Sequence, residues 1–182
     1  MLFRSVSQSR YQGLGVSLKY VGGVAASLGV PFQDVNTALA ILGENGIKGS
    51  TAGTSLRQVL LGLNGSTEKA KTALKELGII TEDGGNKFYT AEGKVKSLSE
   101  VFQILQDATK GMSDQQRTAV MQQIFATRAL PSLIALTREG ADGFAEMAAE
   151  INKTTAFDVA SQRLDNLSGD LEILRGNIGP LS

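Results

Sequence analysis

The sequence predicts an all-α fold, and three observations lead to this prediction. Hydrophobic residues make up 42% of the 182-residue chain and charged residues 20%, a composition typical of a globular domain. Apolar residues recur in steps of three and four along most of the chain, the period of a helix with one buried face. Capping residues stand where these segments begin, and glycine often stands where they end. We expect a compact domain of about eight to nine helices, with one short hairpin or loop insert and a longer C-terminal helix.

The composition also excludes several classes of function. The chain has no cysteine and no histidine, which removes disulfides, thiolate metal sites and nucleophile–histidine arrangements. The formal net charge is zero, so the basic footprint of a nucleic-acid-binding protein is missing. The longest uncharged run, residues 20–33, is too short and too rich in glycine to span a bilayer. We expect a soluble chain with no cofactor, no metal site and no membrane segment in this stretch.

The first two helices are bounded by glycine. Apolar residues form one stripe from Tyr11 to Leu28, and Gly29 ends it. Residues 1–10 precede the stripe; they have no apolar region of a signal peptide and are interpreted as a truncated start. A second helix is expected over residues 32–45, with Pro31 at its start, where proline is tolerated.

Residues 44–57, with the sequence ENGIKGSTAGTSLR, are the most informative stretch. Glycines recur there at steps of three and four, beside small hydroxyl residues. One interpretation is a glycine loop that presents N–H groups to phosphate, but lysine precedes the second glycine and no strand signal comes before it. The other is a tight corner at the start of a third helix, over residues 50–63, where another backbone approaches closely. We favour this helix-packing corner, which consists of Gly46, Gly49, Ser50, Gly53, Thr54 and Arg57.

The middle of the chain combines a fourth helix with the expected insert. Ser66 is the predicted N-cap of the fourth helix, which ends near Gly78. Residues 79–95 break the helical pattern and predict a small hairpin or an ordered loop. Glu82, Asp83 and Asn86 suggest a cation site as an alternative, but they lack the ligand spacing of an EF-hand loop.

Capping signals predict the helices that follow. Ser97-x-x-Glu100 and Ser113-x-x-Gln116 each have the pattern of a capping box. A short helix is expected over residues 129–139, with Pro131 in its first turn, and Asp142 is the predicted cap of the next.

The last segment has the most regular apolar pattern. Steps of four and three continue over about three and a half heptads, beginning after a possible cap at Thr155-x-x-Asp158. This pattern allows a terminal helix packed on the domain or a coiled-coil strand that pairs with other copies. The possible self-association seam contains Phe157, Leu164, Leu167, Leu171, Leu174 and Ile178. We expect a helical domain over residues 1–154 and a separate heptad-patterned helix over 155–182.

An ordered set of short motifs resembles the core region of the tail tape measure proteins of long-tailed bacteriophages and prophages. The set begins with Ser17-Leu18-Lys19-Tyr20-Val21 and includes the corner at residues 46–57. It continues with residues 73–79, 109–113, 123–130 and Arg163-Leu164-Asp165-Asn166-Leu167. Each motif is short, but nearly the whole chain is covered in the order of the family.

The resemblance implies a structural segment of a phage tail tape measure protein. Such a protein scaffolds tail tube polymerisation, sets tail length, occupies the lumen of the tail tube and is released during genome ejection. Its implied partners are the tail tube protein, tail assembly chaperones, tail tip proteins and other copies of itself. Its implied location is the virion tail, and the host cytoplasm during assembly.

Two other functions are open alternatives. The first is a helical binding module that docks a chaperone or tip protein at the small-residue face around Gly49 and Gly53. The second is a cell-wall hydrolase, which we disfavour because no carboxylate stands alone in an apolar run, as an acid with a raised pKa would. We therefore expect that the chain is not an enzyme.

Overall fold

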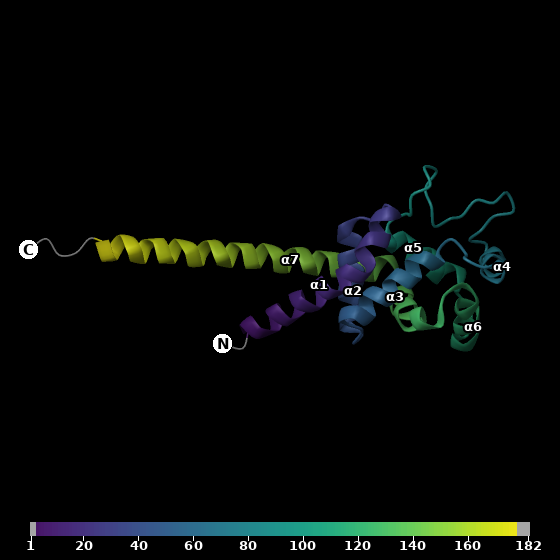
Figure 1. The fold of residues 1–182 in the computed structure, drawn as a ribbon, viewed down its shortest axis with the longest axis horizontal. Coiled ribbons are helices and arrows are strands. Elements are labelled where there is room, and N and C mark those ends of the chain that lie inside the picture. The colour runs from purple at the N-terminus through teal and green to yellow at the C-terminus, as the bar shows by residue number, and fades with distance from the viewer. Residues whose placement is uncertain (1–2, 178–182) are drawn as a thin grey trace, which may run out of the picture. The chain divides into compact units, whose positions relative to one another are not determined.

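The structure is a computed structural model (Figure 1). It describes the backbone of residues 3–177 and the side chains of residues 13–153. The described residues form seven α-helices and one short 3₁₀ helix, so the all-α class is confirmed. The helices are α1 (Phe3–Ser27), α2 (Phe32–Glu44), α3 (Gly49–Gly62), α4 (Glu68–Glu76), α5 (Leu98–Ala108), α6 (Asp114–Ile124), η1 (Thr127–Ala129) and α7 (Leu130–Asn177).

The expected count of eight to nine helices is slightly too high because α7 unites three predicted segments. Residues 129–139, the helix after Asp142 and the terminal helix after Thr155 are one element of 48 residues. Its single non-helical residue is Gly140, with φ 58° and ψ −159°. The predicted helix start at Thr155 is therefore wrong, because α7 continues through this residue. The predicted helix end near Glu139 and the new start near Asp142 correspond to the non-helical backbone at Gly140. Pro131 lies in the first turn of α7, as predicted.

Three helices end in the same backbone motif, as the positions of Gly29, Gly46 and Gly78 predict. At the end of α4, the Ile79 N–H donates to Leu74 O at 2.9 Å and the Gly78 N–H donates to Lys75 O at 2.8 Å. This pair of bonds is the Schellman motif, which satisfies carbonyls that the last helical turn leaves free. The ends of α1 and α2 repeat it, so helix boundaries follow closely from local sequence.

The N-caps are only partly as predicted. Ser113 and Gln116 form the predicted capping box at the start of α6. Ser97 accepts a hydrogen bond from the Glu100 N–H at the start of α5, as expected for a cap. The prediction of Ser66 as N-cap of α4 is wrong: Thr67 takes that role and accepts from the Ala70 N–H at 3.1 Å. Both hydroxyl residues suit the position, and the backbone of Thr67 has the extended conformation that a cap needs.

The insert between α4 and α5 is an ordered loop. Within the described residues it contains two isolated antiparallel bridges, Ile80 with Asn86 and Tyr89 with Val95. Asn86 holds the loop in place, because its side-chain amide donates to Leu63 O at 3.0 Å and its side-chain oxygen accepts from the Phe88 N–H. Phe88 is fully buried, so the loop contributes to the core.

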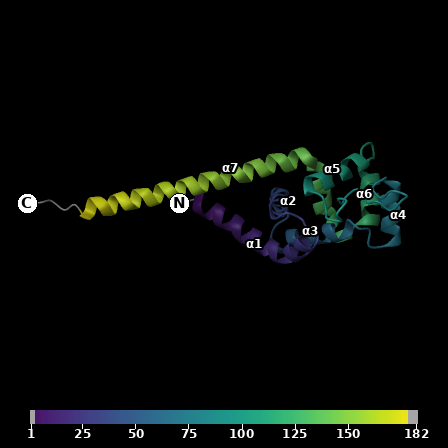
Figure 2. The same cartoon turned by 90° about the horizontal axis from the view of Figure 1, so that it is seen from above.

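The core lies among α1 to α6, the insert and the first part of α7. Its largest fully buried side chains are Leu42, Leu56, Leu60, Leu63, Leu74, Ile79, Phe88, Leu98, Phe102, Leu105, Met121 and Leu133. Both views show α4 beside α6 (Figures 1 and 2), and these two helices are in contact. All these residues belong to the first of two compact units, residues 1–147 and 148–182. The second unit continues α7, and the predicted domain boundary after residue 154 stays a prediction.

Candidate helix-packing site

Helix α3 contains most residues of the predicted packing corner. Its contact with α1 is the most extensive contact between two elements of the described structure. Its buried face carries Ala52, Leu56 and Val59, each at most 1% exposed. Their spacing of four and three places them on one side of the helix. The sequence forms a helix here because Lys48 has an extended backbone and the residues after Gly49 have no proline to interrupt the turn.

At Gly53 the backbones of α3 and α1 approach each other very closely. A Cβ atom built on Gly53 would lie only 2.2 Å from Ser17 O and 2.9 Å from Ser17 Cα. Both of these are backbone atoms, which cannot move aside as the end of a side chain can. Glycine at this position therefore allows the two helix backbones to touch. No space for a phosphate group remains at Gly53.

A buried hydroxyl group reinforces this contact. Ser17 is 2% exposed, and its Oγ lies 2.7 Å from Gly49 O and 2.9 Å from Gly13 O. The single hydroxyl hydrogen can be donated to either carbonyl, and the bond to Gly49 O joins α1 to the first residue of α3. Gly49 has a φ of 59°, so it begins α3 in a left-handed conformation that favours glycine.

Gly46 acts at the end of α2. The Ile47 N–H donates to Leu42 O at 2.9 Å and the Gly46 N–H donates to Gly43 O at 3.2 Å, which is the Schellman arrangement. No atom lies within 4 Å of a Cβ built on Gly46. Its φ of 79° explains the glycine. Gly46 thus turns the chain between α2 and α3 without packing against another helix.

The remaining predicted residues do not join the buried contact. Ser50 and Arg57 are exposed, and Thr54 is half-buried. The structure therefore divides the predicted set: Gly53 is a packing residue, Gly46 and Gly49 set the backbone path, and Ser50 and Arg57 face solvent. The division arises because steps of three and four from Gly46 cross a turn before α3 begins, so helical periodicity does not hold over the whole run.

Two further contacts of α3 were not predicted. A Cβ on Gly62 would lie 2.4 Å from the Phe125 ring, so this glycine provides the space that the ring at the end of α6 occupies. On another side, Ser132 Oγ donates to Ser55 Oγ at 2.6 Å, and both side chains are buried. This bond links α3 to α7. The sequence offers only a weak signal for either contact, because residues far apart in the chain form them.

A carboxylate of α2 caps the N-terminus of α5, which is distant in sequence. The Asp34 carboxylate accepts from the Leu98 N–H at 2.8 Å, next to the Ser97 cap of α5. A negative charge suits the N-terminus of a helix, which carries a partial positive charge. Asp34 was not predicted in this role, since only the tertiary fold brings residue 34 to residue 98.

The charged groups near these helices lie mostly at the surface. Lys71 donates to Glu68 Oε1 at 2.9 Å, and this hydrogen bond together with the lysine charge lowers the pKa of the Glu68 carboxyl from its ordinary value of 4.5. Burial raises the pKa of the Tyr89 hydroxyl. Among the described residues no group of three acidic, histidine or cysteine side chains is placed to hold a metal ion. No helix in the described part of the chain is long and apolar enough to cross a membrane.

The predicted self-association seam falls outside the residues whose side chains are described. The backbone of α7 is helical through Asn177, which includes Phe157, Leu164, Leu167, Leu171 and Leu174. Ile178 lies beyond the described backbone. The seam therefore stays a prediction from periodicity.

The chain is a helical phage tail protein: it belongs to the family described as phage-related minor tail protein, which matches residues 4–126. Two of its relatives in phages are described as tape measure proteins, which confirms the resemblance found in the sequence. It is 30% identical over 162 residues to the tape measure protein of Pneumococcus phage Dp-1, covering 88% of this chain and 14% of that protein. It is 28% identical over 173 residues to the probable tape measure protein of Escherichia phage P2, covering 89% of this chain and 20% of that protein.

The chain thus spans a fifth or less of the length of either relative. No solved structure matches it. The family is established by sequence, and the fold described above adds the geometry of this region.

Proposed function

We propose that the chain is a structural segment of a tape measure protein, which scaffolds tail tube polymerisation, sets tail length and is released during genome ejection. The observation that carries the proposal is similarity to two tape measure proteins over almost nine tenths of the chain. The helical core supports it, because at Gly53 the predicted corner is filled by the backbone of α1 and leaves no open cleft. The proposed location is the lumen of the tail tube, after assembly in the host cytoplasm.

Geometry limits how much length this segment can add to a tape measure protein. A continuous helix of 182 residues would extend about 270 Å. A compact domain of the same length has a radius of gyration of about 16 Å. Residues 1–147 form a compact unit, so in this form they add little length per residue. We propose that this unit acts as an end module of the tape measure, or that it rearranges into longer helices inside the tube.

The test uses a phage that encodes this chain. An in-frame deletion of residues 13–147 should abolish tails of normal length, because the core and every helix contact described above are lost. The control carries Gly43→Ala, at a position where a Cβ meets no atom within 4 Å, and should form normal tails. Infectious particles with unchanged tails after the deletion would contradict the proposal. Cryo-electron microscopy of intact tails distinguishes a globular density from extended helices.

Self-association through α7 is the second part of the proposal. The heptad pattern from Phe157 to Ile178 is that of a coiled-coil strand, and several copies bundled in a tube would bury such a seam. Leu164→Asp with Leu171→Asp should give a monomer in analytical ultracentrifugation. Gln162→Asp with Asn166→Asp, on the outer face of the heptad pattern, should leave association unchanged. A wild-type chain that is monomeric at all concentrations would exclude this seam.

Tail tube protein, tail assembly chaperones and tail tip proteins are the proposed partners. A binding module at the corner would have to use its exposed residues Ser50 and Arg57, because α1 covers Gly53. Copurification of the chain with tail proteins from a lysate tests this role. Loss of one partner in Arg57→Glu, with the fold intact, would identify the corner as a docking surface.

A further inference from the structure

The break in α7 at Gly140 separates two helical stretches that both pack on α5. Gly140 has a φ of 58° and a ψ of −159°, a conformation that is essentially restricted to glycine. On the far side of the break, the Phe144 ring stacks on Phe102 of α5, with ring centroids 5.4 Å apart. The bend is therefore part of the compact unit, and α5 holds both of its sides.

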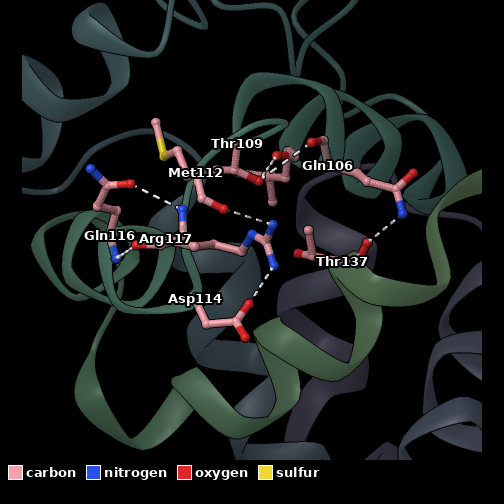
Figure 3. Close-up of polar contacts among 9 residues, drawn as sticks. Gln106, Thr109, Met112, Asp114, Gln116, Arg117 and Thr137 are labelled. Atoms are coloured by element: carbon pink, nitrogen blue, oxygen red, sulfur yellow. Dashed lines mark hydrogen bonds and ion pairs between the residues drawn. The ribbon is translucent and has the colours of Figure 1, made fainter.

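Two glutamines of α5 replace the helical hydrogen bond that the break removes. In a continuous helix the Ala141 N–H would donate to Thr137 O. Instead the Ala141 N–H donates to Gln103 Oε1 at 3.0 Å, Gln103 Nε2 donates to Gln106 Oε1 at 3.2 Å, and Gln106 Nε2 donates to Thr137 O at 3.2 Å. The contact between Gln106 and Thr137 is visible in Figure 3. The donor and the acceptor of one broken helical bond are thus joined through two side-chain amides.

Gln106 also satisfies the next free carbonyl, and Gln103 makes one further side-chain bond. Gln106 Nε2 also lies 3.1 Å from Arg138 O, and Asp107 Oδ1 accepts from Gln103 Nε2 at 3.1 Å. In a continuous helix Arg138 O would accept from the Asp142 N–H. The Ala141 N–H, Thr137 O and Arg138 O thus have partners in the bent form and would also have partners in the straight form.

The bend also brings the backbone of a second glycine, Gly143, close to a preceding residue. A Cβ built on Gly143 would lie 2.6 Å from Glu139 Cβ. Residues four apart on a straight helix keep about 5–6 Å between their Cβ atoms. The chain therefore folds back sharply between Glu139 and Gly143. A straight helix would need glycine at neither Gly140 nor Gly143, so both glycines serve the bent form.

We propose that Gly140 is a two-state hinge, and that Gln103 and Gln106 are the latch that holds it bent. When the latch is released, the Ala141 N–H bonds directly to Thr137 O, and residues 130–147 form one continuous helix. The amide bonds that satisfy the broken helical turn lie between α5 and α7, so a change that draws α5 away from the break releases the hinge. This inference does not depend on the proposed function.

The experiment measures a distance across the hinge. The chain has no cysteine, so spin labels can be attached uniquely after Pro131→Cys and Glu146→Cys, both at exposed positions. In a straight helix these positions would be about 22 Å apart between Cα atoms. The bent form brings them closer, and pulsed electron paramagnetic resonance gives the population of each distance.

Two variants act on the hinge in different ways. Gly140→Ala with Gly143→Ala opposes the bent backbone, so the distance near 22 Å should become the main population. Gln103→Met with Gln106→Met removes the amides and keeps side-chain length, so the ratio of straight to bent form should rise about tenfold. The matched controls are Gly23→Ala, where a Cβ meets no atom within 4 Å, and Gln122→Met with Gln123→Met at exposed positions of α6. Both controls should keep the wild-type distance.

The glutamine variant decides the outcome if the glycine variant does not fold, because it creates no steric clash. A new population near 22 Å in either variant supports the hinge. The proposal is overturned if every folded variant keeps only the wild-type distance. It is also overturned if both variants lose their helical circular dichroism, because the bend would then have no folded alternative.

Discussion

Gly53 is the residue on which the contact between α1 and α3 depends. Gly53→Ala forces a Cβ atom to within 2.2 Å of Ser17 O, and neither helix backbone can yield without losing its packing. We expect a loss of about 3 kcal/mol in the free energy of unfolding, the upper part of the usual range for an overfilled core. Urea denaturation followed by circular dichroism measures the loss.

Gly43→Ala is the matched control for this prediction. Gly43 lies inside α2, and no atom is within 4 Å of its added Cβ. Alanine should stabilise the helix there by up to about 1 kcal/mol, since glycine is a poor helix former. Equal effects of the two substitutions would show that the close approach at Gly53 carries no energetic weight.

The cap of α4 tests how far a helix end can be predicted. Thr67→Ala removes the acceptor of the Ala70 N–H and should cost about 1 kcal/mol. Ser66→Ala should change stability by less than about 0.5 kcal/mol, the usual limit for a surface substitution. Thermal unfolding of both variants compares the two neighbours directly. A larger loss for Ser66→Ala would restore the assignment of the cap to Ser66.

The pair of Glu68 and Lys71 in α4 predicts a pH dependence. Because the Glu68 pKa is lowered in the folded state, the pair adds stability above the ordinary value of 4.5 and loses it as pH falls through the lowered pKa. Glu68→Gln should flatten part of the decline in unfolding free energy between about pH 5 and pH 2. The effect should be small, since the carboxyl is fully exposed. Lys71→Met should flatten the decline in unfolding free energy over the same pH range. An unchanged profile in both variants would contradict a stabilising pair of Glu68 and Lys71.

At the scale of elements, the sequence predicts helix ends better than helix continuity. Gly29, Gly46 and Gly78 mark ends correctly because each Schellman motif is built from backbone bonds within one turn. Thr155 resembles a cap equally well, yet α7 runs through it without a break. A capping side chain only stabilises an end that other interactions create, so its presence in a sequence does not require one.

At the scale of the molecule, the position of the core predicts where the chain can be shortened. The buried core residues extend from Val21 to Phe144 within the described side chains. A fragment of residues 1–154 should therefore unfold cooperatively at nearly the wild-type temperature. A fragment of residues 1–138 loses Phe144 and its stack on Phe102, and should unfold at a clearly lower temperature. Differential scanning calorimetry compares them, and a melted 1–154 fragment would show that residues 155–182 are needed for the fold.

Local patterns in the sequence predict the helical class, most helix ends and the relationship to tape measure proteins. These features depend on periodicity and on residues within one or two turns of each other, so they can be predicted from short stretches of sequence. The packing of whole helices is needed to show that Gly53 touches α1 while Gly46 only turns the chain, that Asp34 caps α5, and that two glutamines hold the break in α7. Each of these contacts joins residues more than 30 positions apart, except the turn at Gly46, and pairing over such separations depends on how whole helices pack.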